Sequence, residues 1–291
     1  MGACRGTGEN PGGVIVQTLM QNFTASDGLR LSYVIDDHTD PWRPVETKET
    51  LFLLHAVLGS SRRFYRWIPE LSRHIRVVRL DMRGHGESGV PDETQFSFQR
   101  LIDDVLELAH HLQCPRFHLA GSSAGAIIAT QIALDHPQRV KTLATFAATP
   151  GLANTNIDHG QWITSVKSKG LRGFFENTIS ERFPPGADPG FVQWFIDEAC
   201  RTDEDFFCRF VPVMRQVNQT ARLHEIRQPM LVVVPDEDPH ISLEQYQVVK
   251  THAPHSEFVI YHGYQHNITD AVPQRCAGEL LRFLRQHGVV Q

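Results

Sequence analysis

A serine lies at the centre of the pentapeptide Gly121-Ser122-Ser123-Ala124-Gly125, between a strand-like apolar run and a segment rich in alanine and isoleucine. In the G-x-S-x-G pattern the serine occupies a sharp strand-to-helix turn, its hydroxyl is exposed, and the flanking glycines relieve crowding. We therefore predict that Ser123 is a nucleophile. The same letters also fit an ordinary turn of small residues, so the prediction depends on a base and an acid elsewhere in the chain.

Two later loops contain residues that would activate this serine. A serine hydroxyl is a weak nucleophile at neutral pH, so it needs a base to accept its proton and an acid to orient that base. For the G-x-S-x-G turn the chain order is serine, acid, histidine. Asp238 follows one apolar strand-like run and His266 follows the next. We predict His266 as the base, with His262 as its main rival, and Asp238 as the acid, with Asp236 and Glu237 as open alternatives.

Two backbone amides are expected to stabilise the negative charge that develops when the serine attacks a carbonyl group. One belongs to Ala124, directly after the serine, and the other comes from the loop at residues 54–60, which follows the third strand-like run. Val57 is the expected second donor. His55 in the same loop precedes the serine in the chain, so we interpret it as a residue that organises the loop through hydrogen bonds.

Alternating strands and helices would position these residues. Apolar runs predict strands at 14–16, 29–35, 51–54, 75–80, 116–120, 140–146, 230–234 and 257–261. Helical spacing predicts helices at 98–112, from the serine turn to about 136, at 243–250 and at 272–286. Strands separated by helices indicate a mostly parallel sheet covered on both faces, a three-layer α/β fold. Such sheets place their sites in loops at the strand ends.

One stretch interrupts this alternation. Residues 151–222 are predicted to form helices at 162–182, 191–201 and 203–217, with Thr202 as an N-cap, and they contain eight of the 17 phenylalanines. We interpret this stretch as a helical cap, or lid, in which Trp162 and Phe183 contact the substrate. Packing within an inserted helical layer explains the aromatic residues equally well. The predicted domains are a loose leader at 1–13, a core at 14–150 and 223–291, and the cap at 151–222.

The composition is that of a globular protein that acts on a small molecule. The chain is 41% hydrophobic with a net charge of -5, and it has no block of basic residues that would favour nucleic acid or a membrane surface. Its five cysteines are dispersed and lack metal-binding spacing. We therefore expect a cytoplasmic protein with no metal and no cofactor. Its oligomeric state is open, with a homodimer as one option.

These motifs together resemble the alpha/beta-hydrolase fold family. Residues 55–60 are similar to the family's His-Gly loop, and residues 81–88 match its D-x-R-G-x-G-x-S turn. The serine turn, Asp238 and His266 complete the resemblance, which spans residues 28–286. It implies the α/β-hydrolase fold, with a serine, histidine and aspartate acting together.

Three details refine this resemblance. The cap around residues 159–170 and 181–183 is similar to 3-oxoadipate enol-lactonases and their relatives. Ala56 stands where the family usually has glycine, and its methyl group is expected to restrict the backbone that aims the Val57 amide. Arg83 and His85, in the Gly-rich turn, are interpreted as structural residues that fix the loop.

The resemblance implies a serine hydrolase that cleaves a small carboxylic ester or lactone through an acyl-enzyme. A serine nucleophile argues against the haloalkane dehalogenase and epoxide hydrolase branches, which use aspartate. Three alternatives on the same fold stay open: hydrolysis of a carbon–carbon bond in a ring-cleavage or β-diketone-type substrate, cofactor-free dioxygenation, and ligand reception without turnover. The sequence alone does not identify the substrate.

Overall fold

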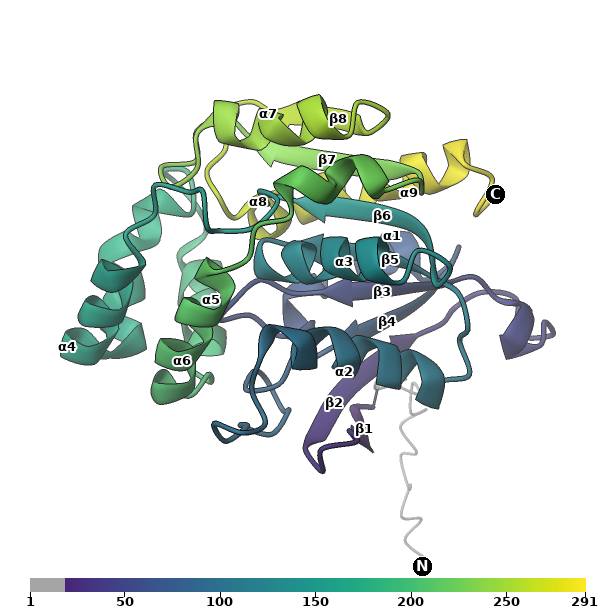
Figure 1. The fold of residues 1–291 in the computed structure, drawn as a ribbon, viewed down its shortest axis with the longest axis horizontal. Coiled ribbons are helices and arrows are strands. Elements are labelled where there is room, and N and C mark those ends of the chain that lie inside the picture. The colour runs from purple at the N-terminus through teal and green to yellow at the C-terminus, as the bar shows by residue number, and fades with distance from the viewer. Residues whose placement is uncertain (1–18) are drawn as a thin grey trace, which may run out of the picture.

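The computed structural model describes residues 19–291 and is built on an eight-stranded sheet (Figure 1). The strands are β1 (Gln21–Thr24), β2 (Arg30–Asp36), β3 (Thr50–Leu54), β4 (Arg76–Leu80), β5 (Phe117–Ser122), β6 (Val140–Phe146), β7 (Met230–Pro235) and β8 (Glu257–Tyr261). Their order in the sheet is β1-β2-β4-β3-β5-β6-β7-β8. The first two strands pair antiparallel, β2 also runs antiparallel to β4, and all other neighbours are parallel. The leader predicted at 1–13 and the run at 14–16 lie outside the described residues.

Successive side chains of a buried strand point to opposite faces of the sheet, so each central strand contributes to two cores. In β3, Phe52 and Leu54 belong to one apolar cluster, whereas Leu51 and Leu53 belong to another. The first cluster packs under α2 (Phe98–His111), α3 (Ala124–Asp135) and α7 (Leu243–His252), and the second under α1 (Ile68–Leu71) and α9 (Pro273–Gln286). Helices therefore cover both faces, which confirms the predicted three-layer α/β architecture (Figure 1).

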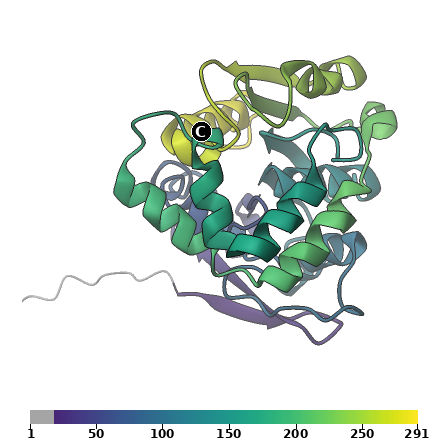
Figure 2. The ribbon, with the colours of Figure 1, turned by 90° about the vertical axis from the view of Figure 1, so that its left-hand side faces the viewer.

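Three helices between β6 and β7 form a layer over one end of the sheet. They are α4 (His159–Thr178), α5 (Pro189–Ala199) and α6 (Glu204–Arg215), and they lie beyond the carboxyl ends of the parallel strands (Figures 1 and 2). We call residues 151–222 the cap segment. Its helices share an apolar cluster that includes Phe175, Phe195 and Phe207. Within residues 19–291, no helix combines the length and the apolar character needed to cross a membrane.

Two local predictions differ from the structure. Strand β1 was not predicted, because its four residues have no apolar run and only Phe23 is buried. The N-cap of α6 is Asp203, whose carboxylate accepts the Phe206 N–H at 2.7 Å, and not Thr202, whose buried hydroxyl has no partner among the described residues. The negative charge of a capping aspartate also interacts favourably with the positive N-terminal end of the helix dipole, whereas a threonine carries no charge.

Candidate active site

Ser123 stands in a tight turn between β5 and α3. Its backbone has φ 49° and ψ -115°, a positive φ that residues with a side chain seldom adopt. Two glycines allow the turn to pack closely. A Cβ atom on Gly121 would lie 2.5 Å from the Ala126 nitrogen, and one on Gly125 would lie 2.3 Å from the Leu54 carbonyl oxygen. The turn therefore positions the Ser123 hydroxyl at the floor of a cavity.

Gly125→Ala is expected to destabilise the protein by about 3 kcal/mol, because the new methyl group would meet the backbone of β3 at the centre of the sheet. Gly278→Ala in α9 is the matched control. Nothing lies within 4 Å of a Cβ atom at that position, and alanine is more favourable than glycine inside a helix by up to about 1 kcal/mol. Urea unfolding of both variants measures the difference, and an unchanged free energy of unfolding for Gly125→Ala would contradict this account.

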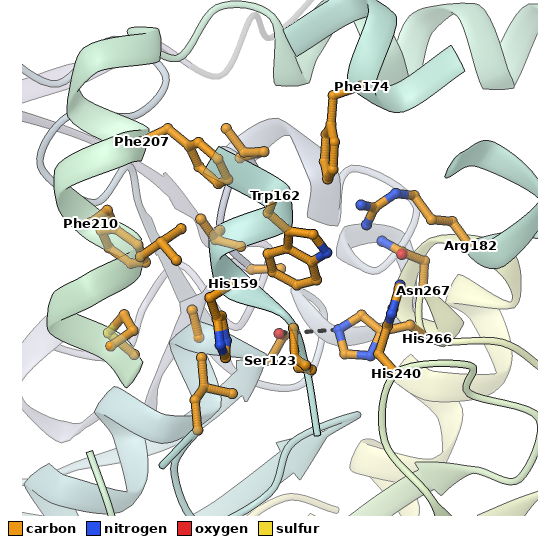
Figure 3. Close-up of a pocket in the computed structure, with 18 of the residues that line it drawn as sticks. Ser123, His159, Trp162, Phe174, Arg182, Phe207, Phe210, His240, His266 and Asn267 are labelled. Atoms are coloured by element: carbon orange, nitrogen blue, oxygen red, sulfur yellow. Dashed lines mark hydrogen bonds between the residues drawn. The ribbon is translucent and has the colours of Figure 1, made fainter. Parts of the chain in front are cut away.

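The structure brings together the three residues that the sequence predicted to act as a unit. His266 Nε2 lies 3.1 Å from Ser123 Oγ, and His266 Nδ1 lies 2.6 Å from Asp238 Oδ2 (Figure 3). Asp238 follows β7 and His266 follows β8, so neighbouring parallel strands deliver the two side chains to the same edge of the sheet. The carboxylate next to Nδ1 keeps the proton on that nitrogen, which leaves Nε2 free to accept the serine proton.

Four donors hold the Asp238 carboxylate in place. Its Oδ1 accepts the N–H groups of His240 and Ile241 at 2.9 and 3.2 Å, and its Oδ2 accepts the Tyr246 hydroxyl at 2.5 Å in addition to the His266 ring. Burial alone would raise the pKa of Asp238, but the charge of His266 and the hydrogen bonds from His266, Tyr246 and the backbone lower it to about 2. Asp238 is therefore an anion at neutral pH.

Tyr246→Phe is expected to lower kcat/KM about tenfold, because it removes one hydrogen bond to a charged group, roughly 1.5 kcal/mol, from the carboxylate that orients His266. The ionised carboxylate loses a donor, so its pKa rises. The stability that ionised Asp238 provides is present above the unfolded pKa of 3.8 and is lost as the pH falls through about 2 in the wild type. In the variant the loss begins at the same unfolded pKa, but it is smaller in total and is complete at a higher pH.

The control for this prediction is Tyr33→Phe, which also removes a hydroxyl from a buried tyrosine, but in β2 and bonded to Gln21. Its kcat/KM should stay within twofold of the wild type. Ester turnover at pH 7, together with acid unfolding from pH 5 to pH 2, measures both effects. Equal activities for the two variants would show that Tyr246 does not support the carboxylate.

The alternative acids, Asp236 and Glu237, and the rival base, His262, do not contact Ser123. Asp236 pairs with His262, with Oδ2 2.6 Å from Nδ1, and its Oδ1 accepts the Gly263 N–H at 2.8 Å. The His262 side chain is 77% exposed, and that of Glu237 is also exposed. This second pair lies on the surface and ties the loop after β8 to the loop after β7. It does not reach Ser123.

The loop after β3 is organised by His55, as the sequence predicted. The His55 Nδ1 atom lies 2.8 Å from the Ala56 carbonyl oxygen, and Nε2 accepts the Met82 N–H at 3.0 Å, so Nδ1 carries the proton. Burial lowers the pKa of His55 to about 4, which keeps the ring neutral. Ala56 is not among the described non-glycine residues with positive φ, so its methyl group is tolerated. Within this loop, the non-glycine residue with a positive φ is Leu58, at 58°.

The two predicted oxyanion donors, Val57 and Ala124, both belong to the lining of the cavity around Ser123. Ala124 is the first residue of α3, where backbone N–H groups have no partner within the helix. This arrangement suits a pair of amides directed at one oxygen atom. Their role stays a prediction.

The turn at residues 81–88 is held by buried hydrogen bonds and packs against the loop after β3, where its Met82 N–H donates to His55. Arg83 is completely buried and forms two hydrogen bonds of 2.6 Å with Asp104. Asp81 accepts the Ser61 N–H at 2.6 Å and the Glu87 N–H at 2.9 Å. Arg83 and His85 do not line the cavity, in agreement with their structural interpretation.

A narrow cavity of about 60 Å³ lies between the serine turn and the cap segment (Figure 3). Most of its wall is apolar, contributed by Leu58, Leu152, Ile157, Trp162, Phe174, Phe175, Phe195, Phe207, Phe210, Val211, Met214 and Ile241. Trp162 therefore lies where the sequence predicted a substrate contact. Phe183 does not, because it packs against Phe191 and Phe195 behind the wall, where the cap requires an apolar side chain of its own.

Several polar residues of the cavity were missed by sequence reasoning: His159, Arg182, His240 and Asn267. Both ring nitrogens of His159 and the Arg182 Nε atom are buried without a hydrogen-bond partner among the described residues. His159 and Arg182 lie in the two cap segments that the resemblance picked out, but no role was assigned to either residue. His240 and Asn267 lie close in sequence to the predicted acid and base, and that proximity was the available signal for them.

No group of three or more potential metal ligands was found among residues 19–291. A model of the alpha/beta hydrolase fold matches residues 49–186. The chain is 34% identical over 140 residues to the pimeloyl-[acyl-carrier protein] methyl ester esterase of Aeromonas hydrophila, a match that covers 46% of this chain and 51% of that protein. It is 35% identical over 97 residues to the (E)-2-((N-methylformamido)methylene)succinate hydrolase of Acinetobacter baylyi, covering 33% and 36%. The chain thus matches about half or less of the length of these relatives.

Solved structures show a likeness over nearly the whole chain. A hydrolase from Pseudomonas aeruginosa PA01 is 28% identical with a TM-score of 0.78, and the match covers 91% of this chain and 98% of that one. The enol-lactonase from Burkholderia xenovorans LB400 has a TM-score of 0.82 at 18% identity, covering 91% and 100%. At that identity the second likeness concerns the fold alone.

Proposed function

We propose that this chain, which has the alpha/beta hydrolase fold, is a hydrolase that cleaves a small carboxylic ester or lactone with Ser123 as the nucleophile. The observation that carries this proposal is the continuous hydrogen-bond chain from Ser123 through His266 to Asp238. The Ser123 end of this chain lies at the floor of a narrow, mostly apolar cavity. Such a chain supplies the nucleophile, the base and the orienting acid of acyl transfer.

In the first step of the proposed reaction, Ser123 Oγ forms a bond to the substrate carbonyl carbon while its proton moves to His266 Nε2. The carbonyl oxygen becomes an oxyanion, which the amides of Val57 and Ala124 stabilise. The bond to the leaving oxygen then breaks, and that oxygen takes the proton from His266. A water molecule then gives a proton to His266 Nε2 while its oxygen bonds to the acyl carbon, and the bond from that carbon to Ser123 Oγ breaks as Oγ takes the proton back from His266. Asp238 stays ionised and stabilises the imidazolium at each stage.

The proposal is tested by covalent labelling and by turnover. A fluorophosphonate should phosphonylate Ser123 with loss of fluoride, and mass spectrometry of the peptide locates the adduct. A panel of esters and lactones is then assayed by product mass. A lactone gains one water and stays in one piece, an ester gives an acid and an alcohol, and a carbon–carbon hydrolase gives two carbon fragments. An unlabelled Ser123 together with an inert panel would overturn the proposal.

A further inference from the structure

The cavity wall contains a polar ring that the protein itself leaves without a hydrogen bond. His159 is the first residue of α4 and is 2% exposed. The ring lines the cavity around Ser123, and neither Nδ1 nor Nε2 has a partner among residues 19–291. The Ile157 carbonyl oxygen lies near the ring, but it accepts the His159 backbone N–H at 3.0 Å. A buried polar group without a partner is costly, so this ring suits a polar group that arrives with a substrate.

The other buried histidines of the described chain use their ring nitrogens within the protein. Both nitrogens of His55 and both nitrogens of His118 have hydrogen-bond partners. His85 uses one of its two, through a contact of 3.1 Å between Nδ1 and the Arg83 carbonyl oxygen. These three rings lie outside the lining of the cavity. His159 therefore differs from them in the one place where a ligand could reach it.

The protonation state of His159 narrows the chemistry of that ligand. Burial and the charge of Arg215 lower the pKa of His159 below its ordinary value of 6.5, against smaller opposing effects of Ile157 and Asp158. The ring is therefore neutral at pH 7, with a donor on one nitrogen and an acceptor on the other. A hydroxyl group also donates and accepts, so it can bond to the ring in either tautomer. A carboxylate can only accept, and it would lack the imidazolium that makes such a contact strong.

His159 lies where the acyl part of a substrate would extend. In Figure 3 the rings of His159 and His266 lie on opposite sides of Ser123, and Phe210 lies on the His159 side. His266 must protonate the leaving oxygen of an ester, so the leaving group lies near His266 and the acyl group extends toward His159. The Trp162 ring, 5.4 Å from that of His159, is a further apolar part of the cavity wall. The acyl side is therefore apolar with one hydrogen-bonding ring.

We propose that His159 forms a hydroxyl subsite, and that the substrate is an ester or lactone whose short acyl portion carries a free hydroxyl near the carbonyl carbon. The ring binds this hydroxyl through one nitrogen and determines specificity, while Ser123 and His266 carry out the reaction. The proposal rests on the proposed hydrolase function for the direction of the acyl group, but the binding of the hydroxyl does not require turnover.

Two pairs of ethyl esters test the subsite, because in each pair a methyl group replaces the hydroxyl at nearly constant size. Ethyl lactate is compared with ethyl 2-methylpropanoate, and ethyl 3-hydroxybutanoate with ethyl 3-methylbutanoate. In the wild type, kcat/KM should be higher for the hydroxy ester in at least one pair. His159→Phe keeps a ring and removes both nitrogens, so it should lower this preference by roughly 10- to 100-fold. His159→Gln, whose amide has a donor and an acceptor, should retain part of the preference.

Thermal unfolding separates this role from packing alone. His159→Phe replaces two unsatisfied nitrogens with apolar atoms, so Tm should rise by about 2 to 4 °C. His118→Phe is the matched control, because this buried ring in β5 bonds to Thr142 and Glu49 at 2.8 and 3.0 Å. Its Tm should fall by at least about 2 °C, and its ester preferences should equal those of the wild type. A lower Tm for His159→Phe with unchanged preferences would show that the ring only packs, and would overturn the subsite.

Binding to Ser123→Ala, measured by calorimetry, tests the subsite without turnover. The hydroxy ester of the preferred pair should bind more tightly than its methyl twin, and adding His159→Phe to Ser123→Ala should lower this preference at least about tenfold. Equal preferences with and without His159→Phe in both pairs would overturn the subsite. If the wild type also turns the esters over, that result rejects the subsite and keeps the hydrolase. A preference that depends on His159, with no turnover of any ester by the wild type, would do the reverse.

Discussion

Ser123→Ala is expected to lower kcat/KM by at least about 10⁴-fold for every ester or lactone that the wild-type protein hydrolyses. The hydroxyl oxygen forms the covalent bond in the proposed reaction, and its hydrogen bond to His266 Nε2 is 3.1 Å long. Alanine removes that atom but has a Cβ atom like serine, so the positive φ at this position costs the two residues about the same. The turn itself should therefore persist. The residual activity would come from the oxyanion donors and from substrate binding.

Ser122→Ala is the matched control for this prediction. Ser122 is the neighbouring residue and is buried, but its hydroxyl lies 3.1 Å from the Thr269 hydroxyl and does not line the cavity. Its loss should cost one neutral hydrogen bond, about 1 kcal/mol of stability, with kcat/KM within threefold of the wild type. Calorimetry should show that Ser123→Ala still binds substrate. Undiminished turnover by Ser123→Ala would show that the serine is not the nucleophile and would favour chemistry that uses His266 as a base alone.

The sequence predicts those features that depend on residues close together in the chain. The predicted strands at 140–146 and 257–261 coincide with β6 and β8, because buried parallel strands are short apolar runs that end at polar loops. The turn at Ser123 is also local, since its glycines and its serine lie within five residues. Chain order then placed Asp238 and His266 after successive predicted strands, and the structure pairs these strands as β7 and β8.

The sequence does not predict features that depend on how distant segments meet. Asp236 and Asp238 are two residues apart and chemically identical, and only the geometry of the loop gives the first to a surface histidine and the second to His266. Tyr246 reaches Asp238 from the facing side of α7. Phe183 and Arg182 are adjacent, yet one packs into the cap and the other lines the cavity. Helical periodicity does not distinguish these two directions at the irregular end of a helix.

Asp238→Asn is expected to lower kcat about 10⁴-fold near neutral pH, because an amide cannot satisfy the four donors that surround this side chain. Oδ1 accepts two backbone N–H groups, and Oδ2 accepts Tyr246 and the His266 ring. In either orientation the amide group places its own N–H against a donor. When it faces His266, it can donate only to an unprotonated Nδ1, so the ring proton moves to Nε2, which then cannot accept the proton of Ser123.

Asp236→Asn makes the same chemical change two residues earlier and separates this role from a general effect of lost charge. The pair of Asp236 with exposed His262 is worth at most about 1 kcal/mol, so kcat should fall less than about fivefold. Steady-state kinetics of both variants at pH 7, with thermal unfolding to show that each is folded, measure the contrast. A larger loss in Asp236→Asn than in Asp238→Asn would assign the acid to the surface pair. That result is hard to reconcile with the structure, because Asp236 contacts His262, and only the Asp238 carboxylate reaches the ring that faces Ser123.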